Sequence, residues 1–381
     1  MGYFDNASTT FPKPECVYQQ MDEFYCAGGG SFGRGQHAFA MSANNLVEKT
    51  RESIRALLHC PSKQIIFEPT ATISLNIIIQ GIIKNGAKTI YISPFEHNAV
   101  SRTLHSYEKD GLIKVHQLMV TRDLSYDLER IKFQFDETSP DLVIVSHASN
   151  VIGLVAPFEE IFRLAKDYGA TTLLDMAQSA GLVDSNIGQE TIDFAVFAGH
   201  KTMLGPTGIS GFAMKPDYSL PPILYGGTGF DSANQDMPLD LPQRFEIGTM
   251  NGVGVAGLHA AVTWIQEQGI NTLYKAETAN RDRLLQILES YEGLTVVGNV
   301  PGRKYVGIVS CTIDGLSSDI AGQLFSERNI SVRTGLHCAP LAHKFLNTYP
   351  AGTIRFSVNS YTSERDFVEL IDALDDLFNN L

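Results

Sequence analysis

Short apolar strands alternate with amphipathic helical stretches between about residues 44 and 215. β-Branched and aromatic residues dominate the strand-like runs, which are 89–93, 142–146, 171–175 and 194–197. Stretches between them, such as 158–168, space their apolar residues as a helix does. This alternation predicts an α/β domain with a mainly parallel sheet and helices on both faces.

The pattern changes after about residue 250, where the predicted helices lengthen and the strands shorten. We expect helices at 250–268, 273–291, 317–328 and 364–379, and strands at 294–299, 306–314 and 353–358. The first twelve residues are extended and are expected to join this part. We therefore predict a large domain over residues 13–255 and a small α+β domain made of residues 1–12 and 256–381.

Composition excludes several classes of protein. The net charge of −13 leaves no basic surplus for nucleic acid or an anionic membrane. No apolar run approaches the roughly 20 residues that span a bilayer, and the first residues lack the pattern of a signal peptide. The five cysteines are scattered and form no C-x-x-C pair, which predicts a cytoplasmic protein without disulfides or a metal site.

Lys201 follows the apolar run 194–197 almost directly. Ligands of parallel sheets bind at the carboxyl ends of the strands, and burial there lowers the pKa of a lysine and leaves a nucleophilic amine. The alternative is a surface lysine, which the spacing alone favours. The ends of the neighbouring strands reverse that preference.

Asp175 ends the preceding apolar run, 171–175, and Gln178 follows three residues later. A buried carboxylate needs a partner, and the protonated nitrogen of a pyridine ring would supply one while keeping the ring electron-withdrawing. Gln178 would donate a hydrogen bond to a phenolate oxygen on such a ring. The alternatives are a helix N-cap for Asp175 and local backbone contacts for Gln178.

Other strand ends carry groups that suit the same ligand. Small and hydroxylated residues at 69–74 begin an apolar helix, where free N–H groups could hold a phosphate, although ordinary helix caps look the same. His97 could stack on a planar ring or be a core histidine. Asn150 adds an amide after the run 142–146.

A second group of candidates lies near the carboxyl end of the chain. Cys338 lies in a loop bounded by glycine and proline, with His337 beside it and Arg333 near it, a setting that favours the thiolate. Arg355 lies in a predicted strand and could grip a carboxylate through two hydrogen bonds. The alternatives are an ordinary loop cysteine and a salt bridge within the small domain.

Together these segments resemble the class V aminotransferase group of fold-type I pyridoxal-5′-phosphate (PLP) enzymes, and within it the group II cysteine desulfurases and selenocysteine lyases. The most specific parts are F-A-G-H-K at 197–201 and R-T-G-L-H-C at 333–338. The resemblance runs nearly from end to end. It implies a mainly parallel, seven-stranded type of sheet, a smaller α+β domain, PLP as cofactor and a homodimer.

The resemblance also implies roles for individual residues. For catalysis it implies Lys201 as the Schiff-base lysine, Cys338 as the nucleophile and His97 on the ring. The residues implied in cofactor binding are Lys201, His97, Asp175, Gln178, His200, Ala71, Thr72, Asn150 and Thr228, the last of which would reach the partner subunit's cofactor. The residues implied in substrate binding are Arg355, Asn150, Arg34 and His37.

The implied reaction converts L-cysteine to L-alanine and leaves the sulfur on Cys338 as a persulfide, for transfer to an acceptor protein. Alternatives are a selenocysteine lyase, another class V enzyme such as an aminotransferase or cysteine lyase, and a non-catalytic PLP-binding scaffold. Two positions depart from the family pattern. Ala198 replaces a hydroxyl residue near the phosphate, and Leu336 replaces a second histidine, which leaves the substrate preference open.

Overall fold

The computed structural model describes residues 2–26, 35, 37–229 and 233–380. Its largest sheet has seven strands in the order β2-β8-β7-β6-β5-β3-β4. Their bounds are β2 (Gln64–Glu68), β3 (Thr89–Ile92), β4 (Lys114–Gln117), β5 (Leu142–Ser146), β6 (Thr171–Asp175), β7 (Phe194–Ala198) and β8 (Ser210–Met214). Strands β3 to β7 pair in parallel, whereas β8 is antiparallel to both β7 and β2. The predicted seven-stranded, mainly parallel sheet is confirmed.

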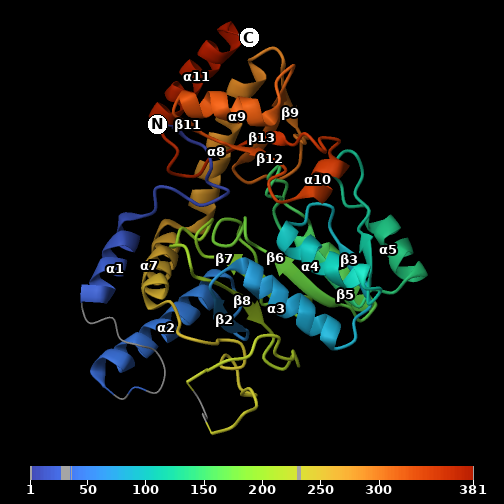
Figure 1. Cartoon of the computed structure of the whole chain (residues 1–381), viewed down its shortest axis with the longest axis vertical. Coiled ribbons are helices and arrows are strands. Elements are labelled where there is room, and N and C mark those ends of the chain that lie inside the picture. Colours follow the sequence, from blue (N-terminus) through green and yellow to red (C-terminus); the bar gives the residue numbers. More distant parts are fainter. Residues whose placement is uncertain (1, 27–34, 36, 230–232, 381) are drawn as a thin grey trace.

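Helices cover both faces of this sheet (Figure 1). Ile144 of β5 belongs to a core with α3 (Ala71–Lys84) and α4 (Asn98–Lys109). Its neighbours Val143 and Val145 point the other way, into a core with α2 (Ala38–Leu57), α5 (Leu128–Glu137), α6 (Phe158–Asp167) and α7 (Gly252–Gln268). Helix α1 (Glu15–Cys26) packs on α7. The continuous apolar runs of the strands follow from this burial on two sides.

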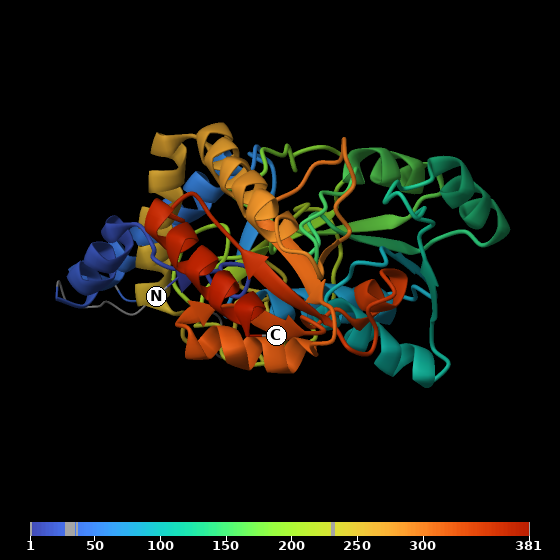
Figure 2. The same cartoon turned by 90° about the horizontal axis from the view of Figure 1, so that it is seen from above.

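A smaller antiparallel sheet lies above the large one, with strand order β12-β13-β10-β9 (Figures 1 and 2, orange to red). Its strands are β9 (Leu294–Val297), β10 (Ile308–Ile313), β12 (Arg333–Gly335) and β13 (Thr353–Ser357), and the accompanying helices are α8 (Ile270–Glu289), α9 (Ser318–Glu327), α10 (Pro340–Phe345) and α11 (Glu364–Asn379). The start of the chain lies here too, because β1 (Gly2–Tyr3) pairs in parallel with β11 (Ile330–Ser331).

Phe4 is fully buried in the core of this smaller part, so the first residues of the chain come close to its last strands. The exact division of the chain at residues 12 and 255 stays a prediction. None of the helices in the described ranges is long and apolar enough to cross a membrane.

Candidate active site

The carboxyl ends of β5, β6 and β7 and the start of α3 enclose a cavity of about 190 Å³. Every residue that we predicted for cofactor binding, except Thr228, lines it. These residues are Ala71, Thr72, His97, Asn150, Asp175, Gln178, His200 and Lys201. The parallel register explains part of this convergence, because it places Ser146 beside Asp175 at the ends of adjacent strands.

Lys201 and Asp175 both line this cavity, and the charge of each acts on the pKa of the other. Burial lowers the pKa of Lys201 to about 8, against the opposing effect of the Asp175 carboxylate. Burial raises the pKa of Asp175, and the hydrogen bond from the Ala177 amide (2.9 Å to Oδ1) opposes that rise. Asp175 therefore caps the following turn with one oxygen, and its other oxygen has no hydrogen bond to the described residues.

The end of the cavity at α3 offers donors without partners. Thr70 caps the helix by accepting a hydrogen bond from the Ile73 amide at 3.2 Å, so the amides of Ala71 and Thr72 stay available. Nδ1 of His200 is buried and has no hydrogen-bond partner among the described residues. Such donors fit a phosphate group, since anions bind at helix N-termini.

His97 begins α4 and lies in the wall of the same cavity. Its Nδ1 accepts a hydrogen bond from the Ala99 amide at 3.0 Å. Burial, together with the positive charge of Lys201, lowers the pKa of His97 to about 4. The imidazole is therefore neutral near pH 7, which suits contact with an aromatic ring.

Cys338 does not line this cavity, but it lies on a loop after β12 that is hydrogen-bonded to the cavity residue Asn150 and to Asn98, the neighbour of His97. Asn150 Nδ2 donates to the His337 carbonyl at 2.6 Å, and the Asn98 amide donates to the Cys338 carbonyl at 2.6 Å. Both loop residues have left-handed backbone conformations, with φ of 46° at His337 and 57° at Cys338. Cys338 Sγ lies 3.5 Å from a terminal nitrogen of Arg333, and the positive charge of Arg333 helps to lower the pKa of Lys201.

Arg355 lies on β13, as predicted, and is 2% exposed. One of its terminal nitrogens donates to the Asn150 carbonyl at 2.9 Å, and the other forms an ion pair with Asp5 at 3.0 Å. Its Nε is buried and has no partner among the described residues. Arg355 thus forms the salt bridge that the alternative interpretation expected, and its Nε is still available to bind a ligand.

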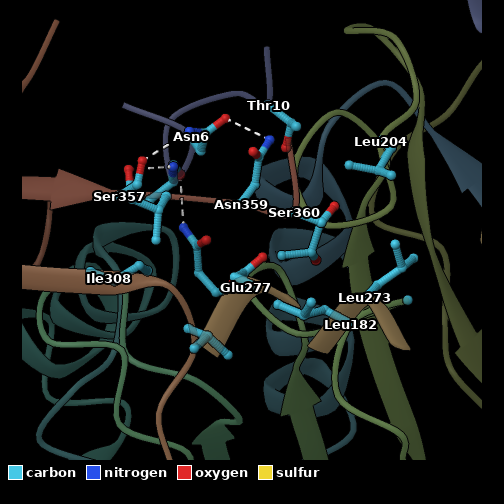
Figure 3. Close-up of a pocket in the computed structure, with 16 residues that line it drawn as sticks. Asn6, Thr10, Leu182, Leu204, Leu273, Glu277, Ile308, Ser357, Asn359 and Ser360 are labelled. Atoms are coloured by element: carbon cyan, nitrogen blue, oxygen red, sulfur yellow. Dashed lines mark hydrogen bonds between the residues drawn. The ribbon is translucent and has the colours of Figure 1, made fainter. Parts of the chain in front are cut away.

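A second, smaller cavity lies behind Gln178, which lines both. We call it the Glu277 chamber, after the Glu277 side chain that reaches it from α8. It has a volume of about 30 Å³, and Asn6, Thr10, Asn359 and Ser360 are among the residues that line it (Figure 3). Gln178 Nε2 donates to the Ala7 carbonyl at 2.8 Å, and this contact lies in the wall between the two cavities.

Glu277 accepts a hydrogen bond from the Gly307 amide at 2.7 Å and has no basic partner among the described residues. Burial raises the pKa of Glu277 to about 8. The carboxyl group is therefore mostly protonated at neutral pH. Lys201 and Glu277 lie on the two sides of Gln178 and have similar pKa values, because burial lowers the pKa of the amine and raises that of the carboxyl group.

Other predicted residues lie elsewhere. Thr228 and His37 do not line the cavity, and His37 caps α2 by accepting a hydrogen bond from the Ala40 amide at 3.3 Å. Arg34 lies outside the described residues. Asp5 and Ser8 contact Arg355 at the site but were missed as site residues, because no local spacing links them to a strand about 350 positions later.

Comparison with known proteins agrees with this geometry. The sequence model of the family described as "Aminotransferase class-V" matches residues 2–370. The chain is 31% identical to a probable cysteine desulfurase of Methanothermobacter thermautotrophicus, over 98% of this chain and 94% of the relative. It is 30% identical to another of Pyrococcus abyssi, over 100% and 94%. The apo structure of a cysteine desulfurase from Thermococcus onnurineus superposes with a TM-score of 0.89 at 28% identity, covering 100% and 95%.

Proposed function

The chain belongs to the class V aminotransferase family, and from that premise we propose that it is a PLP-dependent cysteine desulfurase. It converts L-cysteine to L-alanine and keeps the sulfur as a persulfide on Cys338. One observation carries the proposal. The loop of Cys338 is hydrogen-bonded to Asn98 and Asn150, beside the cavity that holds the buried amine of Lys201.

The residues of the cavity suit PLP. The amides of Ala71 and Thr72 and the unpartnered Nδ1 of His200 would hold its phosphate. The open oxygen of Asp175 would pair with the ring nitrogen, and His97 would lie against the ring. When bound, PLP would supply an electron sink that loosens the bonds at the substrate α-carbon.

Three side chains have separate roles in the proposed reaction. Arg355 binds the substrate carboxylate through its remaining donor, in a buried setting where charge-assisted hydrogen bonds are strong. Lys201, whose pKa of about 8 leaves a useful fraction of neutral amine, moves the α-proton. Cys338, beside the Arg333 guanidinium, attacks the substrate sulfur as a thiolate.

The sulfur transfer needs no outside oxidant. The Cys338 thiolate forms a sulfur–sulfur bond while the carbon–sulfur bond of the substrate breaks. The electron pair of that bond stays on the substrate β-carbon, which takes up a proton and becomes the methyl group of alanine. L-cysteine and a thiol thus give L-alanine and a persulfide, which an acceptor protein then takes up.

We also propose that the chain works as a homodimer. Exposed aromatic and aliphatic side chains gather on the first two helices, where Tyr25 is 66% exposed and Phe39 and Met41 are each 56% exposed. Apolar surface of this kind favours contact with another chain. Thr228, Arg34 and His37 would then act at the active site of the partner subunit.

The test is alanine release from L-cysteine with persulfide detection on the Cys338 peptide. Cys338→Ala should keep the visible absorbance of bound PLP and lose at least about 100-fold in alanine formation from cysteine, because the sulfur has no acceptor. Full activity in this variant would disprove the nucleophile assignment. A parallel assay with L-selenocysteine separates the desulfurase from a selenocysteine lyase, in which Cys338 is less needed.

A further inference from the structure

Two arginines lie directly opposite each other on neighbouring strands. Arg333 of β12 and Arg355 of β13 are paired across the antiparallel ladder. Like charges in this arrangement repel each other, and Arg333 lowers the pKa of Arg355. Each also adjoins a different part of the proposed reaction: Arg333 lies beside Cys338 Sγ, and Arg355 lies at the expected carboxylate site.

A single hydroxyl group joins the two guanidinium groups. Ser8 Oγ accepts a hydrogen bond from Arg333 at 3.0 Å and another from Arg355 at 2.9 Å. It donates its own hydrogen to Asp5 Oδ1 at 2.8 Å. A serine hydroxyl has one hydrogen and two lone pairs, so these three bonds use its whole capacity.

The Asp5 carboxylate partly offsets the two positive charges around Ser8. Asp5 also forms an ion pair with Arg355, so the cluster holds one carboxylate and two guanidinium groups. Burial lowers the pKa of Arg355, Asp5 opposes that change, and Arg333 adds to it. Two arginines and one aspartate therefore give the cluster a net positive charge, which suits a substrate carboxylate.

Ser8 binds only one terminal nitrogen of each arginine. The other terminal nitrogen of Arg333 faces Cys338 Sγ, and Nε of Arg355 has no partner among the described residues. The hydroxyl thus orients both guanidinium planes. It leaves one nitrogen of Arg333 free to face the thiolate and Nε of Arg355 free to bind the substrate.

We propose that Ser8 is a positioning residue that sets Arg333 beside the nucleophile and Arg355 at the substrate carboxylate. The reaction in which it acts rests on the proposed function, whereas its effect on Cys338 does not. Without the hydroxyl, Arg333 loses one hydrogen bond. The two arginines then repel each other with no acceptor between them. Cys338 then has a weaker positive neighbour, and the carboxylate site becomes looser.

The direct test is the charge preference of Cys338 in chemical labelling. The full chain with its cofactor is treated in parallel with iodoacetate, which is anionic, and iodoacetamide, which is neutral, and the labelled peptides are measured by mass spectrometry. Cys26 is exposed and serves as an internal reference in the same sample. The ratio of iodoacetate to iodoacetamide labelling at Cys338 should fall about fivefold in Ser8→Ala, the net value of one lost hydrogen bond of ordinary strength.

Ser8→Thr keeps a hydroxyl group and should keep the ratio, and Cys26 should not change in either variant. Ser290→Ala, which removes an exposed hydroxyl at the end of α8, should have no effect. An unchanged ratio in Ser8→Ala would overturn the proposal, as would an equal fall in Ser8→Thr with an unchanged melting temperature.

Kinetics give a second measurement. In Ser8→Ala, KM for cysteine should rise about fivefold through Arg355, and Ser8→Thr should restore it. If the unaltered protein releases no alanine from cysteine, the proposed function fails, and the labelling ratio still decides the role of Ser8 on its own. An unchanged KM in an active enzyme would remove Arg355 from the proposal.

Discussion

The two cavities that meet at Gln178 show two uses of burial. In the larger one, burial lowers the pKa of Lys201 to about 8, and the amine faces the opposite charge of Asp175. In the Glu277 chamber, burial raises the pKa of a carboxyl group to about the same value, and among the described residues only the Gly307 amide donates a hydrogen bond to it. A shifted pKa by itself therefore does not identify a catalytic group.

The neighbours distinguish the two cases. Lys201 shares its cavity with unpartnered donors, a carboxylate and a nearby thiol, so its neutral form can act on a ligand. Glu277 belongs to α8, and its neutral carboxyl group joins that helix to the Gly307 amide. We expect the first group to affect turnover and the second to affect stability.

The largest effect should come from the active-site side of this comparison. Lys201→Ala removes the amine that moves protons, and turnover of cysteine should fall by about 10³-fold or more. Lys63→Met is a matched control, because burial also lowers the pKa of Lys63 to about 8 but its amine binds the Ile192 carbonyl away from the cavity. That variant should lower the melting temperature and keep kcat. Equal losses of kcat in both variants would contradict the distinction.

A smaller effect should come from the chamber and should depend on pH. Because the pKa of Glu277 in the folded protein lies above that of an unfolded glutamate, its contribution to stability is complete below about pH 4.5 and is lost as the pH rises through about 8. Over that range the loss is at most about 5 kcal/mol. Glu277→Gln should flatten this dependence in thermal melts and leave kcat unchanged. A pH profile that stays as steep as before would place the titrating group elsewhere.

The smallest effect should come from Ala198, which lines the active-site cavity at the end of β7. Ala198→Ser supplies a hydroxyl group at the expected phosphate site and should tighten PLP binding by about 0.5–1.5 kcal/mol, or up to about tenfold. Titration of the apoprotein with PLP, followed by visible absorbance, measures this change. The chamber should be untouched, so the pH dependence of melting should match that of the unaltered protein. Weaker binding would show that the site has no room for the added oxygen.

Much of the large sheet could be predicted because its strands are buried on both faces. The runs 142–146 and 171–175 match β5 and β6, and the parallel order brings their ends together. This geometric rule is why Asp175 and Lys201 could be paired from the sequence. Strand β8 was missed, since Ser210–Met214 lacks the β-branched residues of its neighbours. Its Gly211 is needed for close approach, as a Cβ there would lie 2.1 Å from the Ile66 carbonyl oxygen.

The contacts around the smaller sheet were harder to predict. Arg355 could be assigned to a strand from the local pattern, but its ion pair with Asp5 depends on the first residues folding onto the last strands. No periodicity in the sequence encodes a contact between positions about 350 residues apart. The Glu277 chamber was missed for the same reason, because α8, the first residues and the segment after β13 meet only in the folded chain.

Two hydrogen bonds hold the loop of Cys338 in place. Asn150 donates to the His337 carbonyl, and the Asn98 amide donates to the Cys338 carbonyl. These hydrogen bonds affect how fast the sulfur atom can move as well as where it lies. A loop that must open and close moves over nanoseconds to microseconds or longer, whereas a side chain turns about its bonds within picoseconds to nanoseconds. Because both residues are held by backbone hydrogen bonds, we expect the sulfur of Cys338 to change direction by rotation of its side chain, on the faster of these two timescales.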